Sequence, residues 1–178
     1  MPRVDSFASK LINVPDFPVN GVNFKDITPI LSNKDAFYNI TIEFLEFISK
    51  DCKLIRVDKI IGIESRGFIL ASAVSVMADA GLVPIRKEGR LPRTTYKESV
   101  VLEYGTCCLE IHKDAIVPGE NVIIIDDVLA TGGTSEAAIK LVNSCAGNIL
   151  GLYYLIELTN LKGRDKLGKH NVRSIIQQ

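Results

Sequence analysis

"VIIIDDVLATGGT", residues 122–134, runs from four apolar residues into two adjacent carboxylates and then into a loop of small residues. The apolar run predicts a buried strand, and the stretch TSEAAIKLVNSCAG (134–147) has the spacing of a helix. Plain turn and capping chemistry explains such a junction. It also suits a site where backbone N–H groups of the loop converge on an anion, aided by the positive end of the helix dipole.

The acid pair narrows the kind of ligand. Asp126 and Asp127 would repel a bare phosphate, so the ligand should also carry hydroxyl groups or a cation. Ribose 5-phosphate has both ends, with a diol for the acids and a phosphate for residues 130–134. Neither a Gly-x4-Gly-Lys-Ser/Thr loop nor a dinucleotide-binding fingerprint occurs in the chain.

The composition is that of one globular domain. Of 178 residues, 47% are hydrophobic and 24% charged, which argues against disorder. The 21 Lys and Arg residues balance 21 Asp and Glu residues, so we expect neither nucleic acid nor a membrane as a partner. The four cysteines lack CxxC or disulfide-dense spacing, and the two histidines lie far apart, which predicts a cytoplasmic protein without a Cys/His metal site.

Strands and helices are predicted to alternate along the chain. Helical patterns cover 5–12, 32–50, 67–81 and 134–147, and apolar strand patterns cover 57–64, 82–86, 107–112, 122–126 and 148–158. This order predicts an α/β fold with a parallel sheet, in which ligands bind outside the carboxyl ends of the strands. Residues 64–67 and 126–134 both fall at that edge.

Several separated stretches, in the same order, resemble the adenine phosphoribosyltransferases, which are type I phosphoribosyltransferases. They are PDFP, FKDITPIL, ESRGFIL, PIRKEGRLP, VLEYG, LEIHKDAI and ELTNLKGRDKL, and the resemblance runs from about residue 7 to the end. It implies a mostly parallel central sheet flanked by helices in a single domain (1–178), with an N-terminal hood (about 1–34) and a mobile flap (about 91–105).

The resemblance also implies an activity. Adenine and 5-phosphoribosyl-1-pyrophosphate (PRPP) would give AMP and pyrophosphate through an oxocarbenium-like transition state, in purine salvage. A homodimer would carry this out with Mg²⁺ held mainly by PRPP, so that no protein metal ligand is expected. Two alternatives stay open: a phosphoribosyltransferase for another purine base, and a non-catalytic sensor of PRPP or nucleotides.

For the sugar and the 5-phosphate, the resemblance implies that 122–134 is the PRPP motif. Asp126 and Asp127 would face the ribose, while the 5-phosphate would bind Ala130, Thr131, Gly132, Gly133 and Thr134.

For the pyrophosphate, the resemblance points to ESRGF (64–68), which otherwise reads as a plain helix start. Ser65 and Arg66 would bind, and a cis peptide in this loop would be Glu64–Ser65; Glu64 stands where relatives commonly carry Asp, which leaves its contact open. The basic run PIRKEGRLPR (84–93) would add Arg86, Lys87 and Arg90, although such a run is usually a solvated face. Arg93 departs from the family pattern and is assigned no role.

For the base, the resemblance implies contacts from the hood and the flap. Asn23 and Lys25 would bind adenine through their backbone, Phe24 would stack on it, and Leu158 would pack on its other side. The sequence alone favours a core position for Phe24. Thr94 to Gly105 would form the flap or an ordinary surface hairpin, with Glu103 and Tyr104 as its functional pair. The predicted catalytic residues are Glu103, Asp126, Asp127 and Arg66.

Overall fold

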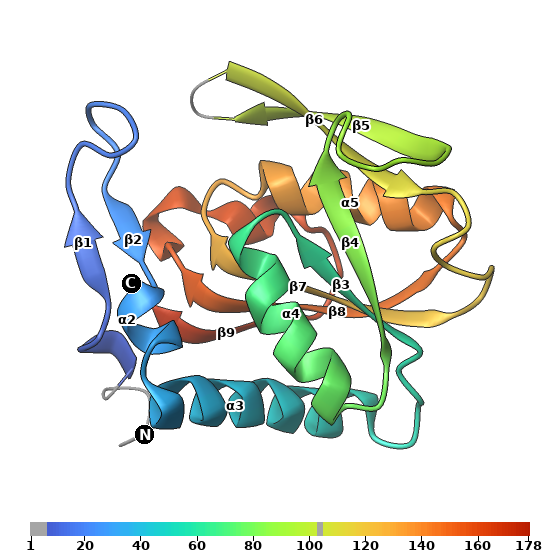
Figure 1. Ribbon diagram of the computed structural model, residues 1–178, viewed down its shortest axis with the longest axis horizontal. Helices are drawn as coiled ribbons and strands as arrows, with labels where there is room; N and C mark the ends of the chain where they lie inside the picture. Colours follow the sequence, from blue (N-terminus) through green and yellow to red (C-terminus); the bar gives the residue numbers. More distant parts are fainter. Residues whose placement is uncertain (1–6, 103–104) are drawn as a thin grey trace. The chain divides into compact units, whose positions relative to one another are not determined.

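The computed structural model describes residues 7–102 and 105–178, and the chain forms two compact units, Met1–Glu43 and Phe44–Gln178 (Figure 1). In the first unit, β1 (Ile12–Val14) pairs antiparallel with β2 (Phe24–Asp26), and the short helix α2 (Thr28–Leu31) follows. The helix predicted over 5–12 is wrong in its later part, because helix covers only 7–8 of its described residues and Ile12 begins β1. Pairing with β2 outweighs the local helical pattern there.

Helix α3 (Lys34–Cys52) begins in the first unit and ends in the second. The helical pattern over 32–50 predicts this helix to within two residues at each end. The Oδ1 atom of Asn33 accepts a hydrogen bond of 2.9 Å from the N–H of Ala36, which satisfies one of the free donors of the first turn. The predicted helix is confirmed.

A seven-stranded sheet with the order β5-β6-β4-β3-β7-β8-β9 forms the second unit. The parallel strands are β3 (Lys59–Ile63), β4 (Gly81–Lys87), β7 (Asn121–Leu129), β8 (Asn148–Glu157) and β9 (Val172–Gln177). An antiparallel hairpin, β5 (Thr95–Leu102) and β6 (Gly105–His112), joins the sheet at β4. The predicted α/β fold with a mostly parallel central sheet is confirmed.

Alternation along β3 sends its side chains into two layers. Ile61 and Ile63 join a core cluster to which α5 (Gly133–Ser144) contributes Ala137, Ala138, Leu141 and Val142. Gly62, between the two isoleucines, faces α4 (Arg66–Met77), where a Cβ atom on it would lie 2.8 Å from the Cβ of Ala71. The two helices therefore cover opposite faces of the sheet, and in Figure 1 α4 crosses in front of β3 and β7.

The β5–β6 hairpin is anchored in the same core. Val100, Leu109 and Ile111 are at most 3% exposed and belong to the cluster that contains α5. The flap predicted over about 91–105 therefore contains a regular strand, β5, whose pairing with β6 runs from Thr95 opposite His112 to Leu102 opposite Gly105.

Among the parallel strands, β7 and β9 differ most from the sequence prediction. The strand expected over 122–126 continues to Leu129, because Asp126 to Leu129 pair with Tyr154 to Glu157 of β8 and Leu129 is buried. β9 was not predicted; it forms because β8 provides a parallel partner and Ile176 is buried there. Among helices in the described ranges, none is long and apolar enough to cross a bilayer.

One half-buried carboxylate, that of Asp51, ties the end of α3 to β8 and β9. Asp51 accepts hydrogen bonds from Arg173 (Nη2 2.5 Å, Nε 3.0 Å), from Asn171 Nδ2 (2.5 Å) and from the Tyr153 hydroxyl (3.2 Å). The hydrogen bonds from Arg173 hold the pKa of Asp51 below its ordinary value, although burial acts in the opposite direction. Asp51 is therefore an ionised brace between elements distant in sequence.

Replacing Asp51 by Ala should lower the free energy of unfolding by about 1–3 kcal/mol, because it removes hydrogen bonds to a charged group. The depressed pKa makes this stabilisation fully present above about pH 3.9, the ordinary aspartate value, and lost as the pH falls from there through the lower folded value. Urea unfolding of both proteins across that pH range measures the effect. Glu46→Ala is the control, since its pair with Lys50 is exposed and worth about 0.5 kcal/mol or less; equal losses in the two variants would contradict the role of Asp51.

Candidate active site

The carboxyl ends of β3, β4, β7 and β8 meet at one edge of the sheet, because these strands are parallel neighbours. The segments at this edge carry most of the predicted site residues, namely Ser65, Arg66, Arg86, Lys87, Arg90, Asp126, Asp127, Ala130, Thr131, Gly132, Gly133, Thr134 and Leu158. Ligands of open parallel sheets bind at such an edge. The structure thus gathers residues that lie up to three strands apart.

The acid pair lies within β7 and is nearly excluded from water. Asp126 is 9% and Asp127 6% exposed, and Oδ2 of Asp127 lies 2.8 Å from Nε of Arg66, the first residue of α4. The N–H of Asp127 donates to Oδ1 of Asp126 at 2.9 Å. A Cβ atom on Gly67 would lie 2.6 Å from that same oxygen, so α4 can begin this close to the acids only with glycine there.

The buried carboxylates of Asp126 and Asp127 have one neighbouring guanidinium, that of Arg66. Burial raises the pKa of Asp126 well above its ordinary range, and the neighbouring charge of Asp127 raises it further. Burial also raises the pKa of Asp127, while Arg66 acts against it. Oδ2 of Asp127 is paired with Arg66 by charge but has no aligned hydrogen bond within the described residues. The set therefore favours a ligand that brings hydroxyl donors or positive charge.

The segment after β7 forms the start of α5. Gly132, the N-cap residue, has a φ of +81°, a left-handed conformation that favours glycine. The first N–H groups of a helix have no acceptor within it, and Thr131, Gly133 and Thr134 are half-buried, which leaves them accessible. The hydroxyl of Tyr154 donates to Oγ of Ser135 at 2.7 Å and fixes the helix start to β8. This arrangement suits a phosphate group.

Glu64, which follows β3, binds the end of the neighbouring strand β4. Its Oε2 accepts hydrogen bonds from the N–H of Lys87 (2.9 Å) and from Nε of Arg86 (3.2 Å). Burial raises the pKa of Glu64, but these donors outweigh burial and the pKa is lowered overall. The contact left open at this position is therefore made with the cations of the basic run, and the Glu64–Ser65 peptide is cis, as the resemblance implied.

Glu110 of β6 was missed in the sequence. It is 2% exposed and accepts hydrogen bonds from the N–H groups of Arg90 (3.0 Å) and Leu91 (2.9 Å) and from the hydroxyl of Thr95 (3.1 Å). An acid inside the apolar strand CCLEIH was the available signal. Glu110 thus holds the segment between β4 and β5 that presents Arg90.

Arg93, which departs from the family pattern, is used within the hairpin. Its guanidinium forms an ion pair with Asp114 and lies 3.3 Å from Nδ1 of His112. Arg93 therefore joins the start of the hairpin to the turn after β6. Glu103 and Tyr104 lie outside the described residues.

The predicted hood residues belong to the first unit. Asn23 is exposed, and Phe24 is half-buried with its ring edge-on to Phe17 at a centroid distance of 5.1 Å. The ammonium of Lys25 donates to Oδ1 of Asn13 at 2.8 Å, across the β1–β2 ladder. Phe24 is therefore not a fully buried core residue, and its position in β2 fixes it beside Asn23 and Lys25.

The carboxylates at this edge bear on how a metal ion could bind. Across 7–102 and 105–178, no group of three or more His, Cys, Asp and Glu side chains is placed to hold one. Asp126 and Asp127 provide two carboxylates. Because Mg²⁺ is commonly bound by one or two carboxylates together with substrate phosphates, this edge fits a magnesium ion that arrives with a phosphorylated substrate.

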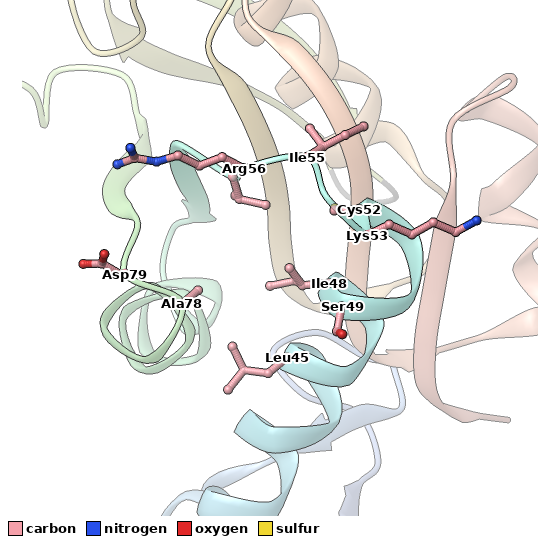
Figure 2. A pocket seen from close by; sticks show the side chains of 10 residues that line it. Leu45, Ile48, Ser49, Cys52, Lys53, Ile55, Arg56, Ala78 and Asp79 are labelled. Carbon is pink, nitrogen blue, oxygen red and sulfur yellow. The ribbon is translucent and has the colours of Figure 1, made fainter.

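A separate hollow of about 490 Å³ lies elsewhere on the second unit (Figure 2). It is lined by the end of α3, the segment before β3 and the end of α4, including Ile48, Ile55, Arg56 and Asp79. Since α4 runs back to the amino end of β4, the hollow lies at the opposite edge of the sheet from the acid pair. None of the predicted site residues lines it.

Known proteins share both the sequence and the fold. Residues 30–177 match the family model of the phosphoribosyl transferase domain. The adenine phosphoribosyltransferase of Halothermothrix orenii is 48% identical over 166 residues, which cover 93% of this chain and 95% of that protein.

Solved structures of adenine phosphoribosyltransferases share the fold of this chain. The crystal structure of adenine phosphoribosyltransferase from Rhodothermus marinus is 44% identical, with a TM-score of 0.93 and 99% of both chains covered. The Saccharomyces cerevisiae enzyme, complexed with adenine and an iminoaltritol bisphosphate, is 36% identical, with a TM-score of 0.93 and 98% of both chains covered. This chain belongs to the adenine phosphoribosyltransferase family.

Proposed function

We propose that this chain transfers the phosphoribosyl group of PRPP to adenine, releasing AMP and pyrophosphate in purine salvage. The observation that carries the proposal is one sheet edge at which an acid pair, a helix N-terminus and several cations meet. PRPP has three parts of matching chemistry, namely a ring with a diol, a 5-phosphate and a pyrophosphate. The similar yeast enzyme is complexed with adenine and a bisphosphate together.

The charges are arranged for a substitution at C1 of the ribose. The bond from C1 to pyrophosphate breaks, a nitrogen of adenine bonds to C1, and the proton on that nitrogen is lost. As positive charge develops on the ring, Asp126 and Asp127 stabilise it. Arg66 and the basic-run cations Arg86, Lys87 and Arg90 receive the pyrophosphate together with Ser65. Residues 130–134 hold the 5-phosphate and so position C1 for attack.

Arg66 connects the two ends of the reaction. Its Nε lies 2.8 Å from Oδ2 of Asp127. A pyrophosphate oxygen that competes for the guanidinium leaves more of the charge of Asp127 for the ring. Binding of the leaving group thereby strengthens the negative field where the oxocarbenium-like charge forms.

The base is recognised by the hood and the flap in this proposal. Phe24 stacks on the purine, Leu158 packs on its other side, and backbone groups of Asn23 and Lys25 pair with the adenine edge, so that a 6-oxo purine is mispaired. Glu103, with Tyr104 beside it, closes over the site, excludes water and assists proton transfer at the base.

Mg²⁺ is the proposed cofactor, held mainly by the pyrophosphate and ribose oxygens of PRPP. When bound, it neutralises charge on the departing pyrophosphate. Asp126 and Asp127 would orient the diol of the ribose and could add carboxylate oxygens to the ion. We place the protein in the cytoplasm, where its four cysteines, all free in the structure, would stay reduced.

We propose that the working form is a homodimer. Apolar side chains are exposed along α4 and beside it: Ile69 (43%), Val76 (82%), Met77 (45%) and Leu82 (43%). Ile69 and Val76 are seven residues apart on one helix face, and burial against a second copy would remove this surface from water. Sedimentation equilibrium measures the mass directly.

An assay of pyrophosphate release with PRPP, with and without magnesium, tests the function. Adenine should be used at least about 100-fold more efficiently than hypoxanthine, guanine or xanthine, because a site built for an amino group leaves buried groups unpaired with a 6-oxo base. Preference for another base would support the first alternative. Tight PRPP binding without release of pyrophosphate would support the sensor.

The double variant Asp126→Asn with Asp127→Asn should abolish turnover while the fold is retained, because both negative charges that face the ring are removed. Steady-state rates with saturating adenine and PRPP measure this, and circular dichroism checks the fold. Near-normal rates in the double variant would exclude the assignment of the acids.

The single variant Asp126→Asn should lose activity but gain stability. Because burial raises the folded pKa of Asp126, keeping it ionised costs free energy once the pH exceeds about 3.9, and the cost is complete above the folded value. Asparagine removes this cost and keeps the Oδ1 acceptor for Asp127. A gain on the order of 1 kcal/mol corresponds to about 2–4 °C in Tm at neutral pH; a lower Tm would contradict the argument.

A further inference from the structure

The chain between β8 and β9 packs against residues 130–134, here called the phosphate-binding segment. It contains two 3₁₀ turns, η1 (Thr159–Leu161) and η2 (Gly163–Lys166). A Cβ atom on Gly163 would come well inside 3.0 Å of the carbonyl oxygen of Ala130, and would lie 3.0 Å from the nitrogen of Gly132. The backbone of η2 therefore touches the backbone of the phosphate-binding segment without any side chain between them.

The contact is reciprocal. A Cβ atom on Gly132 would likewise fall far within 3.0 Å of the carbonyl oxygen of Gly163. Real Cβ atoms essentially never approach so closely, so both positions need glycine, and neither backbone can move toward the other. One side of residues 130–132 is thus closed by η2, and a ligand has access from the other side.

Arg164, the next residue, locks η2 in place. Its guanidinium forms an ion pair with Glu157 at the end of β8, including a hydrogen bond of 2.7 Å from Nη2, and it donates to the carbonyl of Val172 (2.9 Å) and the hydroxyl of Ser174 (3.0 Å) in β9. Glu157 is 4% exposed, and its hydrogen bonds from Arg164 lower its pKa despite burial. The charge pair is therefore fixed between three segments of the chain.

We infer that Gly163 and Arg164 are positioning residues for the 5-phosphate of PRPP, an inference that rests on the proposed function. Converging N–H groups bind an anion well only if they are held in place before it arrives, since ordering the loop on binding costs affinity. Arg164 fixes η2, Gly163 transmits that position by backbone contact, and residues 130–134 are held against movement away from the ligand.

The contact between Gly163 and residues 130–132 should affect only the binding of the 5-phosphate end of PRPP. Gly163→Ala must push the carbonyl of Ala130 away and turn the N–H groups out of register. The KM for PRPP should rise at least about 10-fold, and the affinity for ribose 5-phosphate, measured by calorimetry, should fall by a similar factor. The KM for adenine should change less than about twofold, because the base site does not use these N–H groups.

Arg164→Ala should reproduce the effect without adding any atom, and Arg164→Lys should restore part of it, since lysine keeps the charge but loses the planar fork. Asp165→Ala is the matched control, an exposed position in the same turn, and should leave both KM values unchanged. If Gly163→Ala does not fold, the Arg164 variants decide by the same criteria.

A loss of general stability would lower kcat or raise both KM values together, and such a result overturns the inference. The inference is also overturned if Arg164→Ala keeps both its KM for PRPP and its affinity for ribose 5-phosphate within about twofold of the parent protein. The proposed function fails separately, if the parent protein releases no pyrophosphate from PRPP with adenine. The binding of ribose 5-phosphate still judges the roles of Gly163 and Arg164 in that case.

Discussion

The adjacent carboxylates of Asp126 and Asp127 are buried within β7, and a single guanidinium, that of Arg66, pairs with them. The packing around β7 is arranged to allow this burial. Arg66 can reach Asp127 only because α4 begins beside β7, and α4 can begin there only because Gly67 leaves room for Asp126. Gly62 extends the same close packing along β3. The acid pair therefore depends on the small residues of α4 as well as on Arg66.

Carboxylates also hold the segments around the site. Glu64 binds the end of β4, Glu110 binds the segment after it, and Glu157 binds the turn behind the α5 start. Each is at least half-buried, and each has a pKa lowered by the donors that it accepts from. Since these acids are neutralised by their own neighbours, the exposed cations Lys87 and Arg90 stay available for an anionic ligand, although the chain as a whole has no net charge.

The sequence predicted what depends on local pattern. Buried parallel strands read as continuous apolar runs, so the strand–loop–helix unit at 122–134 was recognisable, and its family resemblance named most residues at the sheet edge. Features set by distant partners were missed. β9 exists because β8 offers a free edge, Glu110 acts on Leu91, and Gly163 meets Ala130, contacts between residues 19 or more positions apart that no window of sequence reveals.

The location of the site follows from the strand order. From β3 the chain passes through α4 to β4 on one side, and from β7 it passes through α5 to β8 on the other side. The two connections diverge between β3 and β7, and because α4 and α5 cover opposite faces, their N-termini flank the carboxyl ends of these two strands. A crevice at such a switch point receives two helix N-termini at once. A ligand with an anionic group at each end and a developing positive charge between them matches that field, with Asp126 and Asp127 at its centre.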